Sequence, residues 1–551
     1  MVNQASLPTL DRLQATIPKE LDVKKEAADW LASFEAHVQS QNIEAFDKIF
    51  VEDAYFRDIL ALTWDFRTFE GIHDIKVFLK DRLPEVKPRS FKLDESFQVH
   101  LDQVYPDLAW IQAMFKFETE VGLGSGVFRL VPTAGGQWKA HTVFTNLEDL
   151  KGFPEKIGNL RSHEPNHGKW LEKRRVEKEY AGREPTVLVV GGGQSGLDTA
   201  ARLKFLDVPT LVIEKLPRIG DMWRNRYAAL FPPSWPVWTP ALKLADWLES
   251  YAHTMELDVW TSSTVISATK DESGELWDVL VKHVDGTERV FHPKHVVFAT
   301  GITGGTPKMP AFLGVEEFGG QILHSSEHGK ASDHTGKKVV VVGACTSAHD
   351  ICADYYENGI AAYVENGPPT DVADRLSASF PNKLLKLVHQ RTTKDIAEAD
   401  AKLLGDLKKR GFRTTLGDDD SGFVLLAWEK AGGYYLDVGA SQMIIDGKIK
   451  LKNYSLIKHL TKTGIKFEDG SELQGNVIVC ATGYGDARDA IRKICGDDIA
   501  DKCRPLWGFD EEKELNGVWR DTGVKNLWSM MEIKAIEEGV FGARYSFNTP
   551  V

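Results

Sequence analysis

TVLVV-GGGQSG, residues 186–196, begins the stretch of sequence that decides the fold of this chain. The apolar run 186–190 is typical of a strand that is buried on both faces of a parallel sheet. Residues 197–206 have helical spacing, and a second apolar run, 210–213, ends at Glu214. Strand, glycine loop, helix, strand and acid in this order predict a β-α-β unit that binds a dinucleotide.

Each part of this stretch has a physical task in such a unit. Gly191 permits the tight turn, Gly193 lets the backbone approach a pyrophosphate, and Gly196 lets helix and strand pack closely. The helix that begins near Gln194-Ser195 presents its N-terminus to the phosphates, and Glu214 can accept a hydrogen bond from a ribose hydroxyl. A purely structural glycine turn would not need the helix, second strand and acid that follow here.

A second glycine loop follows another buried-strand pattern, Lys338–Val342 (KVVVV). Its sequence, GACTSA at 343–348, is G-x-C-x-x-A, in which small residues replace two of the usual glycines. We expect Gly343, Ser347 and Ala348 to receive a dinucleotide, followed by a helix through Tyr355 and a strand near 361–364. Two such loops suggest two dinucleotides, one retained and one consumed, as in enzymes that pass hydride from nicotinamide to flavin.

A third motif lies between the two loops. FGGQILH at 318–324 fits F-x-G-x-x-x-H through Phe318, Gly320 and His324. Together with the two glycine motifs in this order, it resembles the signature of class B flavoprotein monooxygenases. The segments 220–224 (GDMWR), 299–301 (ATG) and 481–484 (ATGY) also agree with that family. The terminal position of the signature departs from it, because His328 stands where flavin-containing monooxygenases have Tyr or Phe and Baeyer–Villiger enzymes have Trp.

The resemblance covers about residues 160–551 and implies a function. NADPH (NADH is possible) would reduce FAD, dioxygen would form a flavin hydroperoxide, and a small organic substrate would be oxygenated. It is greatest for the YUCCA-like branch. His324 would belong to the linker between the dinucleotide domains, and no side chain is expected to act as a catalytic acid or base. The resemblance assigns FAD to residues Gly191, Gly193, Gln194, Ser195, Gly196, Glu214, Trp223, Arg224, Ala299, Thr300 and Gly301.

Three stretches that face the cofactors are shorter than the family's pattern. Tyr227–Phe231 passes almost directly to Trp235, where relatives have a longer apolar segment. Glu365 occupies the place of the arginine that meets the 2′-phosphate of NADPH. It either indicates a preference for NADH or is loop sequence next to an absent segment. We favour the second interpretation, because Gly-Pro-Pro follows at once. Met531 joins directly to a final helix that begins at Glu532.

These departures leave rival functions open beside the monooxygenase. One is a catalytically impaired flavoprotein or a dimerisation scaffold, in which NADPH does not reduce the flavin. Another is an uncoupled NAD(P)H oxidase that makes hydrogen peroxide whatever substrate is offered. A faulty gene model would explain the short stretches equally well.

Residues 1–150 have a different pattern, with helices first and strands after them. Helical spacing marks Trp30–Val38, Ile43–Phe50 and Ile72–Leu79, and then apolar and polar residues alternate over 111–118. A turn at 134–136 separates two further strands. This order resembles the cone-shaped fold of nuclear transport factor and polyketide cyclases. Asp58, Asp65 and His73 could line its pocket, but we favour positions at the surface or as helix caps.

The fold class we expect is therefore α/β, with two Rossmann-like dinucleotide-binding domains after an α+β cone-shaped domain. The boundaries are 1–150 for the cone-shaped domain, 151–185 for a linker with one amphipathic helix over 170–180, 186–335 and 476–551 for the FAD domain, and 336–475 for the NAD(P)H domain.

Composition limits the partners. A net charge of −13 argues against nucleic acid, and no apolar stretch is long enough to span a membrane. Five cysteines without a close pair fit a reducing cytoplasm and argue against a disulfide reductase. We expect a small-molecule substrate, dioxygen and no metal site, and a second copy of the chain stays open as a partner.

Overall fold

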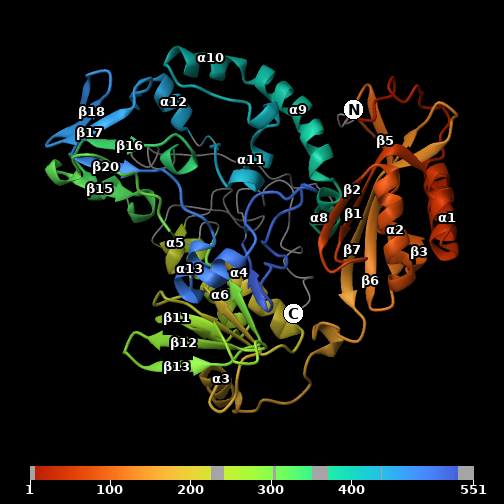
Figure 1. Cartoon of the computed structure of the whole chain (residues 1–551), viewed down its shortest axis with the longest axis horizontal. Helices are drawn as coiled ribbons and strands as arrows, with labels where there is room; N and C mark the ends of the chain where they lie inside the picture. The colour runs from red at the N-terminus through yellow and green to blue at the C-terminus, as the bar shows by residue number, and fades with distance from the viewer. Residues whose placement is uncertain are drawn as a thin grey trace.

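The structure is a computed structural model that describes residues 6–224, 241–301, 306–329, 331–349, 370–435, 437 and 439–531. Its elements form an N-terminal unit and two parallel sheets with their accessory strands and helices (Figure 1). The mixed α/β fold class expected from the sequence is confirmed. No helix among the described residues is both long and apolar enough to cross a bilayer.

The N-terminal unit is built on one seven-stranded sheet in the order β2-β1-β7-β6-β5-β3, with β4 paired to β5. Neighbouring strands are antiparallel, except that β1 and β7 are parallel. The strands are β1 (Phe50–Ile59), β2 (Phe66–Glu70), β3 (Arg89–Leu93), β4 (His100–Tyr105), β5 (Leu108–Glu118), β6 (Gly122–Pro132) and β7 (Trp138–Leu150). The expected hairpin around 134–136 is confirmed as β6 and β7.

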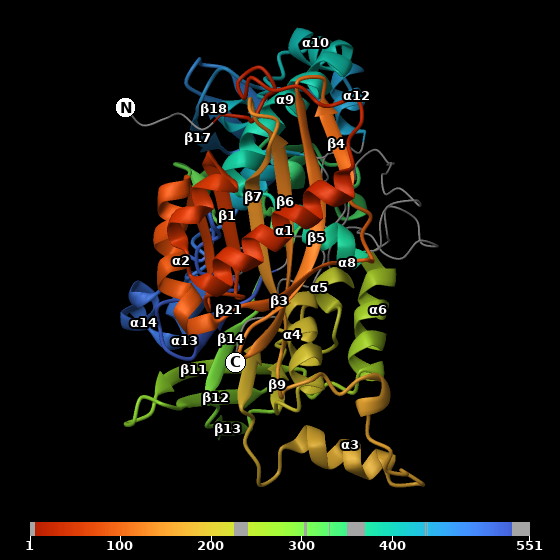
Figure 2. The ribbon, with the colours of Figure 1, turned by 90° about the vertical axis from the view of Figure 1, so that its right-hand side faces the viewer.

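Two helices, α1 (Val23–Ser40) and α2 (Ile72–Val86), cover one face of this sheet (Figure 2). The ring of Trp30 lies 4.5 Å from that of Phe128 on β6, and Phe78 lies 5.7 Å from Phe56 on β1. Large aromatic side chains of this kind supply most of the apolar area of a core. Both helices lie where their apolar spacing predicted them.

The short helix expected over 43–50 ends earlier than predicted. A 3-10 turn, η1 (Ile43–Lys48), occupies its first part, and Phe50 already belongs to β1, where it pairs with Ala140. The β-branched and aromatic residues Ile49, Phe50 and Val51 fit a half-buried strand as well as a helix, and pairing with β7 decides between them.

The three polar residues considered for a pocket differ in burial, and Asp65 is half-buried. His73 is exposed, as expected. The surface interpretation was wrong for Asp58, which is fully buried and accepts hydrogen bonds from Leu62 N–H, Thr63 N–H and Thr145 Oγ–H. Burial raises the pKa of Asp58 to about 6 against these bonds, which lower it. Its carboxylate therefore closes the loop between β1 and β2.

A connector with η2 (Gly158–Leu160) and the predicted helix α3 (Trp170–Glu179) leads to the first parallel sheet. That sheet has the order β10-β9-β8-β14-β21, and all its pairs are parallel. Its strands are β8 (Val187–Val190), β9 (Thr210–Ile213), β10 (Val259–Trp260), β14 (His295–Phe298) and β21 (Leu527–Ser529). Around it lie α4 (Gln194–Phe205), α5 (Asp221–Arg224), α6 (Ala241–Thr254) and the antiparallel strands β11 (Ser263–Lys270), β12 (Trp277–His283) and β13 (Glu288–Phe291).

The second parallel sheet has the order β15-β20-β16. Its strands are β15 (Gln321–His324), β16 (Val339–Val342) and β20 (Val477–Cys480). Of these three strands, β16 lies inside the segment expected as the second dinucleotide domain, 336–475, whereas β15 precedes that segment and β20 follows it. Three antiparallel strands, β17 (Ile457–Thr461), β18 (Gly464–Phe467) and β19 (Glu472–Gln474), lie beside it.

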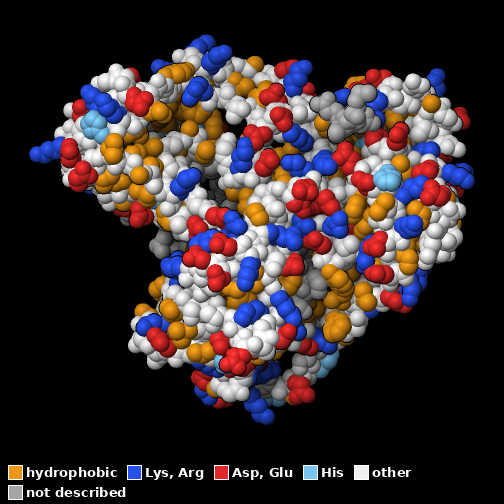
Figure 3. Space-filling view, viewed as in Figure 1, with side chains coloured by type: hydrophobic (Ala, Val, Ile, Leu, Met, Phe, Trp, Pro, Cys, Tyr) orange, Lys and Arg blue, Asp and Glu red, His pale blue; other side chains and the backbone are white. Residues whose placement is uncertain are grey.

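A layer of helices connects this sheet with the N-terminal unit, and α8 and α9 lie between the two in Figure 1. The described helices in this layer are α8 (Thr370–Ala378), α9 (Asn382–Ala399), α10 (Ala401–Lys409), α11 (Phe423–Lys430) and α12 (Ala440–Ile445). Two further helices, α13 (Asp489–Cys495) and α14 (Asp497–Lys502), come before β21, and short 3-10 turns are η3 (Val315–Glu317), η4 (Ser325–Glu327), η5 (Ala331–His334) and η6 (Asp418–Asp420). Acidic and basic side chains are intermingled over the face seen in Figure 3.

Candidate functional site

The first glycine loop turns the chain sharply from β8 into α4. Gly191 has φ +113°, and a Cβ at this residue would lie 2.4 Å from the carbonyl oxygen of Ala299. A Cβ at Gly196 would lie 2.0 Å from the carbonyl oxygen of Gly191. Glycine is therefore required at both positions, because β8, α4 and the end of β14 approach more closely than any side chain allows.

Gly193 serves the loop in a different way. Its φ of −77° suits any residue, but a Cβ there would lie 3.0 Å from the sulfur of Met222. The glycine thus leaves room beside α5. Gln194 and Ser195 follow at the partly exposed first turn of α4, where backbone N–H groups lack acceptors within the helix and favour an anion.

Glu214 lies beside the loop although it is 22 residues away from Gly192. Its carboxylate accepts from Gly192 N–H at 2.7 Å and from Leu216 N–H at 2.8 Å. Two charge-assisted bonds to backbone fix its orientation. A carboxylate has about four acceptor positions, so this one retains capacity for a hydroxyl of a ligand.

Trp223 and Arg224 occupy the short helix α5. The indole N–H of Trp223 donates to Gln194 Oε1 at 3.0 Å, which brings this expected site residue to the glycine loop. Arg224 instead forms ion pairs with Asp221, Asp246 and Glu249, at 2.8 to 3.0 Å. The guanidinium therefore anchors α5 to α6 in addition to any role beside a ligand.

Ala299, Thr300 and Gly301 follow β14 at the same edge of the first sheet. The amide of Ala299 donates to the carbonyl of Val190 at 2.9 Å, and Gly301 has φ +88°. The first sheet thus brings together the glycine loop, Glu214, Trp223 and the end of β14 at the carboxyl ends of its strands, where ligands of open parallel sheets bind.

The second glycine loop repeats part of this arrangement. Gly343 has φ +138°, and a Cβ there would lie 2.4 Å from the carbonyl oxygen of Ala481, which follows β20. Ala348 is buried at 3% exposure, so its small side chain replaces the third glycine in packing the helix against the sheet. Ser347 is half-buried near the start of the helix.

A neighbouring segment contacts the start of this helix. The N–H and the hydroxyl of Thr346 both donate to the carbonyl oxygen of Tyr434 at 3.1 Å. The ring of Tyr435 stacks on that of His349 with centroids 3.7 Å apart and planes 3° from parallel. The N–H of Thr346 therefore already has an acceptor, the backbone carbonyl of Tyr434, at the helix end that would otherwise face an anion.

His324 of the third motif is a packed residue at 1% exposure. Its Nε2–H donates to the carbonyl of Gly483 at 2.9 Å, and its Nδ1 accepts from Ser326 N–H at 3.2 Å. Both nitrogens are thus engaged, which leaves the imidazole no free position for proton transfer. Gly320 permits a close approach as well, since a Cβ there would lie 2.3 Å from Asn476 O and 2.7 Å from the Phe318 ring.

The cysteines do not form a redox pair among the residues that the structure describes. Cys345, Cys480, Cys495 and Cys503 are free thiols. Burial raises the pKa of Cys480 to about 11 and, with the neighbouring thiol of Cys503, that of Cys495 to about 12. These two groups therefore stay protonated and unreactive at neutral pH.

Several expectations fall on residues outside the described ranges. They are the short stretch from Tyr227 to Trp235, the helix and strand expected between Asp350 and Val364, Glu365, and the final helix from Glu532. The sequence also left two contacts unanticipated. Met222 borders Gly193, and Tyr434 meets a loop 88 residues before it. Met222 lies inside the GDMWR segment, which could have suggested it, whereas no sequence signal marks Tyr434.

Comparison with known proteins identifies the family of this chain. The family model "Flavin-binding monooxygenase-like" matches residues 226–495. A probable indole-3-pyruvate monooxygenase, YUCCA10 of Arabidopsis thaliana, is 30% identical over 320 residues, which are 55% of this chain and 82% of the relative. Indole-3-pyruvate monooxygenase YUCCA1 of Oryza sativa subsp. japonica is 29% identical over 335 residues, 57% of this chain and 80% of the relative.

Among solved structures, a flavin-containing monooxygenase from Stenotrophomonas maltophilia has a TM-score of 0.41 at 19% identity, covering 66% of this chain and 96% of its own. Cyclohexanone monooxygenase from Rhodococcus sp. Phi1 bound to NADP+ has a TM-score of 0.41 at 18% identity, covering 56% and 73%. The relative at 30% identity, matched over most of its length, agrees with the family model and with the motifs placed above. The chain belongs to the flavin-binding monooxygenase-like family, a family of oxidoreductases.

Proposed function

We propose that this chain is an NAD(P)H-dependent flavoprotein monooxygenase that transfers one oxygen atom of dioxygen to a small organic substrate. The observation that carries the proposal is the first glycine loop, where Gly191 and Gly196 allow an approach that no side chain permits and Glu214 lies beside the loop. Family membership supplies the reaction class. When bound, FAD would supply the electron transfer and oxygen chemistry that protein side chains lack.

The residues fit FAD at the first loop. Its pyrophosphate would meet the N-terminus of α4 beside Gly193, and Glu214 would accept from a ribose hydroxyl. Trp223, held by Gln194, would border the flavin side of the same edge. We assign the remaining contacts to Gly191, Ser195, Gly196, Arg224, Ala299, Thr300 and Gly301.

We assign the nicotinamide dinucleotide to the second loop through Gly343, Ser347 and Ala348, with NADPH preferred and NADH possible. Gly343 supplies the tight turn and Ala348 the close packing of helix on sheet. Phe318, Gly320 and His324 would act as positioning residues. His324 holds the end of β15 against the segment after β20, and Gly320, beside the Phe318 ring, lets the start of β15 approach Asn476 just before β20. We propose that the second domain comprises 336–475 together with β15 and β20, and that 186–314 and 481–531 make up the first.

One observation favours a second candidate, a flavoprotein that NADPH does not reduce. The carbonyl of Tyr434 already accepts from Thr346 at the start of the second helix, where a phosphate would bind. This contact requires Tyr434 to move before a dinucleotide reaches the helix N-terminus. A flavoprotein in which it does not move would keep its FAD and remain oxidised.

The visible spectrum of the purified protein, recorded before and after anaerobic NADPH, tests both candidates. We expect a yellow protein that NADPH bleaches. A yellow protein that stays oxidised would favour the second candidate, and a colourless protein that FAD does not restore would contradict both. Peroxide formed in proportion to NADPH whatever substrate is offered would identify an uncoupled oxidase.

The substrate class to test first is a 2-oxo acid with an aromatic side chain, since two relatives are named for indole-3-pyruvate. Formation of a decarboxylated product with consumption of NADPH would support this class. Amines and sulfides are the comparison substrates.

A further inference from the structure

The N-terminal sheet has one face that α1 and α2 leave uncovered. Phe56 and Phe128 point to the helices, where they meet Phe78 and Trp30. Side chains alternate along a strand, so their neighbours Arg57 and Arg129 point to the opposite side. Both arginines are buried there, at 8% and 1% exposure. Something other than the two helices therefore covers this face, which we call the outer face.

Two distant segments of the same chain cover the outer face. The first is 375–383, at the end of α8 and the start of α9, and the second is the loop 510–520 ahead of β21. The first segment lies in the sequence between β16 and β20 of the second parallel sheet. The second leads into a strand of the first parallel sheet. The outer face therefore contacts an extension from each of the two dinucleotide-binding sheets.

The two arginines close the end of α8. Arg57 Nη1 donates to the carbonyls of Ala378, at 2.5 Å, and Phe380, at 3.3 Å. Arg129 Nη2 donates to Ser379 Oγ at 2.8 Å, and its guanidinium lies 3.6 Å from the centroid of the Phe380 ring. The last carbonyls of a helix have no N–H donors within the helix and carry its negative end, so two cations stabilise α8 from outside.

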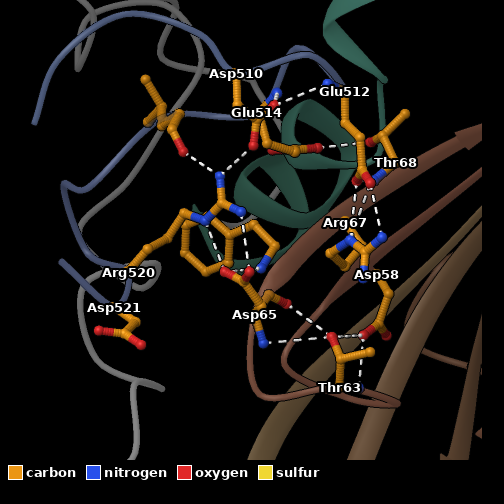
Figure 4. Close-up of polar contacts among 12 residues, drawn as sticks. Asp58, Thr63, Asp65, Arg67, Thr68, Asp510, Glu512, Glu514, Arg520 and Asp521 are labelled. Carbon is orange, nitrogen blue, oxygen red and sulfur yellow. Dashed lines mark hydrogen bonds and ion pairs between the residues drawn. The ribbon is translucent and has the colours of Figure 1, made fainter. Parts of the chain in front are cut away.

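Ion pairs hold the loop 510–520 against the N-terminal unit, and each side contributes both arginine and carboxylate side chains (Figure 4). Glu514 accepts from Arg57 and from the hydroxyl of Thr68, each at 2.6 Å. In the opposite sense, Arg520 of the loop donates to Asp65 of the N-terminal unit at 2.7 Å. The remaining pairs at this interface are Arg67 with Glu512, Arg375 with Asp94, Lys383 with Glu70, and Arg391 with Asp107.

Buried charges make this contact specific. A buried arginine or glutamate that loses its partner is strongly unfavourable, so the two surfaces are stable together and costly to expose separately. The outer face is consequently occupied by its own chain in this structure. A small-molecule ligand or a second copy of the chain would have to displace these pairs to bind there.

We propose that the N-terminal unit is an internal brace: its outer face binds segments 375–383 and 510–520 of its own chain and so fixes the two dinucleotide-binding sheets relative to one another. The value of this arrangement for catalysis rests on the proposed function, in which hydride passes between dinucleotides held by the two sheets. The brace itself requires no bound cofactor.

Hydrogen exchange of the full-length protein, followed by mass spectrometry, tests the brace. Arg129→Met keeps the volume of the side chain and removes the hydrogen bonds to α8. We expect amides of 376–399 to exchange about tenfold faster or more, the effect of losing hydrogen bonds to a charged group. Arg174→Met is the matched control, because Arg174 is also a buried arginine, at 8% exposure, but pairs with Asp258, away from the outer face.

A milder pair of variants keeps the test decisive if Arg129→Met does not fold. Ser379→Ala removes the hydroxyl that accepts from Arg129 and donates to Leu376 O, and it should speed exchange in the same segment by at least about fivefold, the effect of one ordinary hydrogen bond. Ser263→Ala changes an equally buried serine on β11 and should leave 376–399 unchanged.

Unchanged exchange of 376–399 in the variants of residues 129 and 379 would overturn the brace. So would a separate, earlier unfolding transition of the N-terminal unit in calorimetry of the unmodified protein. The exchange measurement requires no bound flavin or NADPH, so a colourless protein can still show the brace. A yellow, reducible protein with unchanged exchange would remove the brace and leave the proposed function standing.

Discussion

Arg57 and Glu514, separated by 457 residues in the chain, share two parallel hydrogen bonds of 2.6 Å, Nε to Oε1 and Nη2 to Oε2. Planar, bidentate pairs of this kind are the strongest that arginine and carboxylate form. The Glu514 side chain is 1% exposed and also accepts from Thr68. One carboxylate thus joins β1 and β2 to the loop that precedes β21.

Breaking this pair from either side should destabilise the protein. Arg57→Met leaves a buried carboxylate without its cation, and we expect the free energy of unfolding to fall by about 3–5 kcal/mol. Urea unfolding of the wild type, Arg57→Met, Glu514→Leu and the double variant Arg57→Met/Glu514→Leu measures the coupling. The double variant should recover most of the loss, because two apolar side chains replace two charges. If the losses of the single variants simply add in the double variant, the two residues do not act as a pair.

The two glycine loops allow a matched comparison. Gly191→Ala and Gly343→Ala each place a Cβ 2.4 Å from a carbonyl oxygen, in a backbone conformation with positive φ. We expect Gly191→Ala to purify without FAD. We expect Gly343→Ala to retain FAD but to be reduced by NADPH at least about tenfold more slowly, since misplacement at a binding loop has effects of this size. Flavin absorbance per protein and anaerobic stopped-flow reduction provide the two readouts. Loss of FAD from both variants would contradict the separate assignment of the loops.

The contact of Thr346 with Tyr434 predicts a gain of affinity. Thr346→Ala removes the hydroxyl that donates to the Tyr434 carbonyl and should release that segment more easily. One ordinary hydrogen bond corresponds to about fivefold, so the Kd for NADP+ should fall by about that factor in calorimetric titration. Ser347→Ala removes the neighbouring hydroxyl and is the control, with unchanged or weaker binding expected. Weaker binding in both variants would show that Tyr434 does not compete with the dinucleotide.

Stability should decrease as the pH falls below neutrality, partly through His295. Its Nδ1 accepts from the indole N–H of Trp528 at 3.1 Å, and burial, with Lys294 and Lys270 nearby, lowers its pKa to about 4. The unfolded chain, with a histidine pKa of about 6.5, binds more protons between these values, so the free energy of unfolding falls as pH drops from 6.5 to 4.

His295→Asn keeps an acceptor for Trp528 and does not titrate, so its unfolding free energy should depend less steeply on pH over this range. Urea unfolding at pH 7 and pH 5 measures the difference. Some slope should remain, because burial also lowers the pKa of His141 to about 4. An identical slope in the variant and the wild type would exclude His295 as a source.

The order strand, glycine loop, helix and acid at 186–214 was readable from the sequence because all its parts are local. Apolar runs specify buried strands, and glycine is required where backbone atoms lie closer than a Cβ allows. The same reasoning predicted α1, α2, α3 and the β6–β7 hairpin. Family membership followed from motifs at fixed spacing, whereas the assignment of individual site residues remains a prediction.

Contacts between distant residues could not be read in this way. The alternation in β5 predicts a solvent-facing side with Gln112, yet Gln112 is 6% exposed because the rest of the chain covers the outer face. Packing of other segments likewise buries Asp58, whose carboxylate closes a loop, and brings Tyr434 to the second glycine loop. The sequence by itself determined the local elements and the family, since propensity and spacing act between near neighbours. Only the tertiary structure decided which polar face is shielded from water and which buried charges pair, because desolvation depends on every segment that packs against that face.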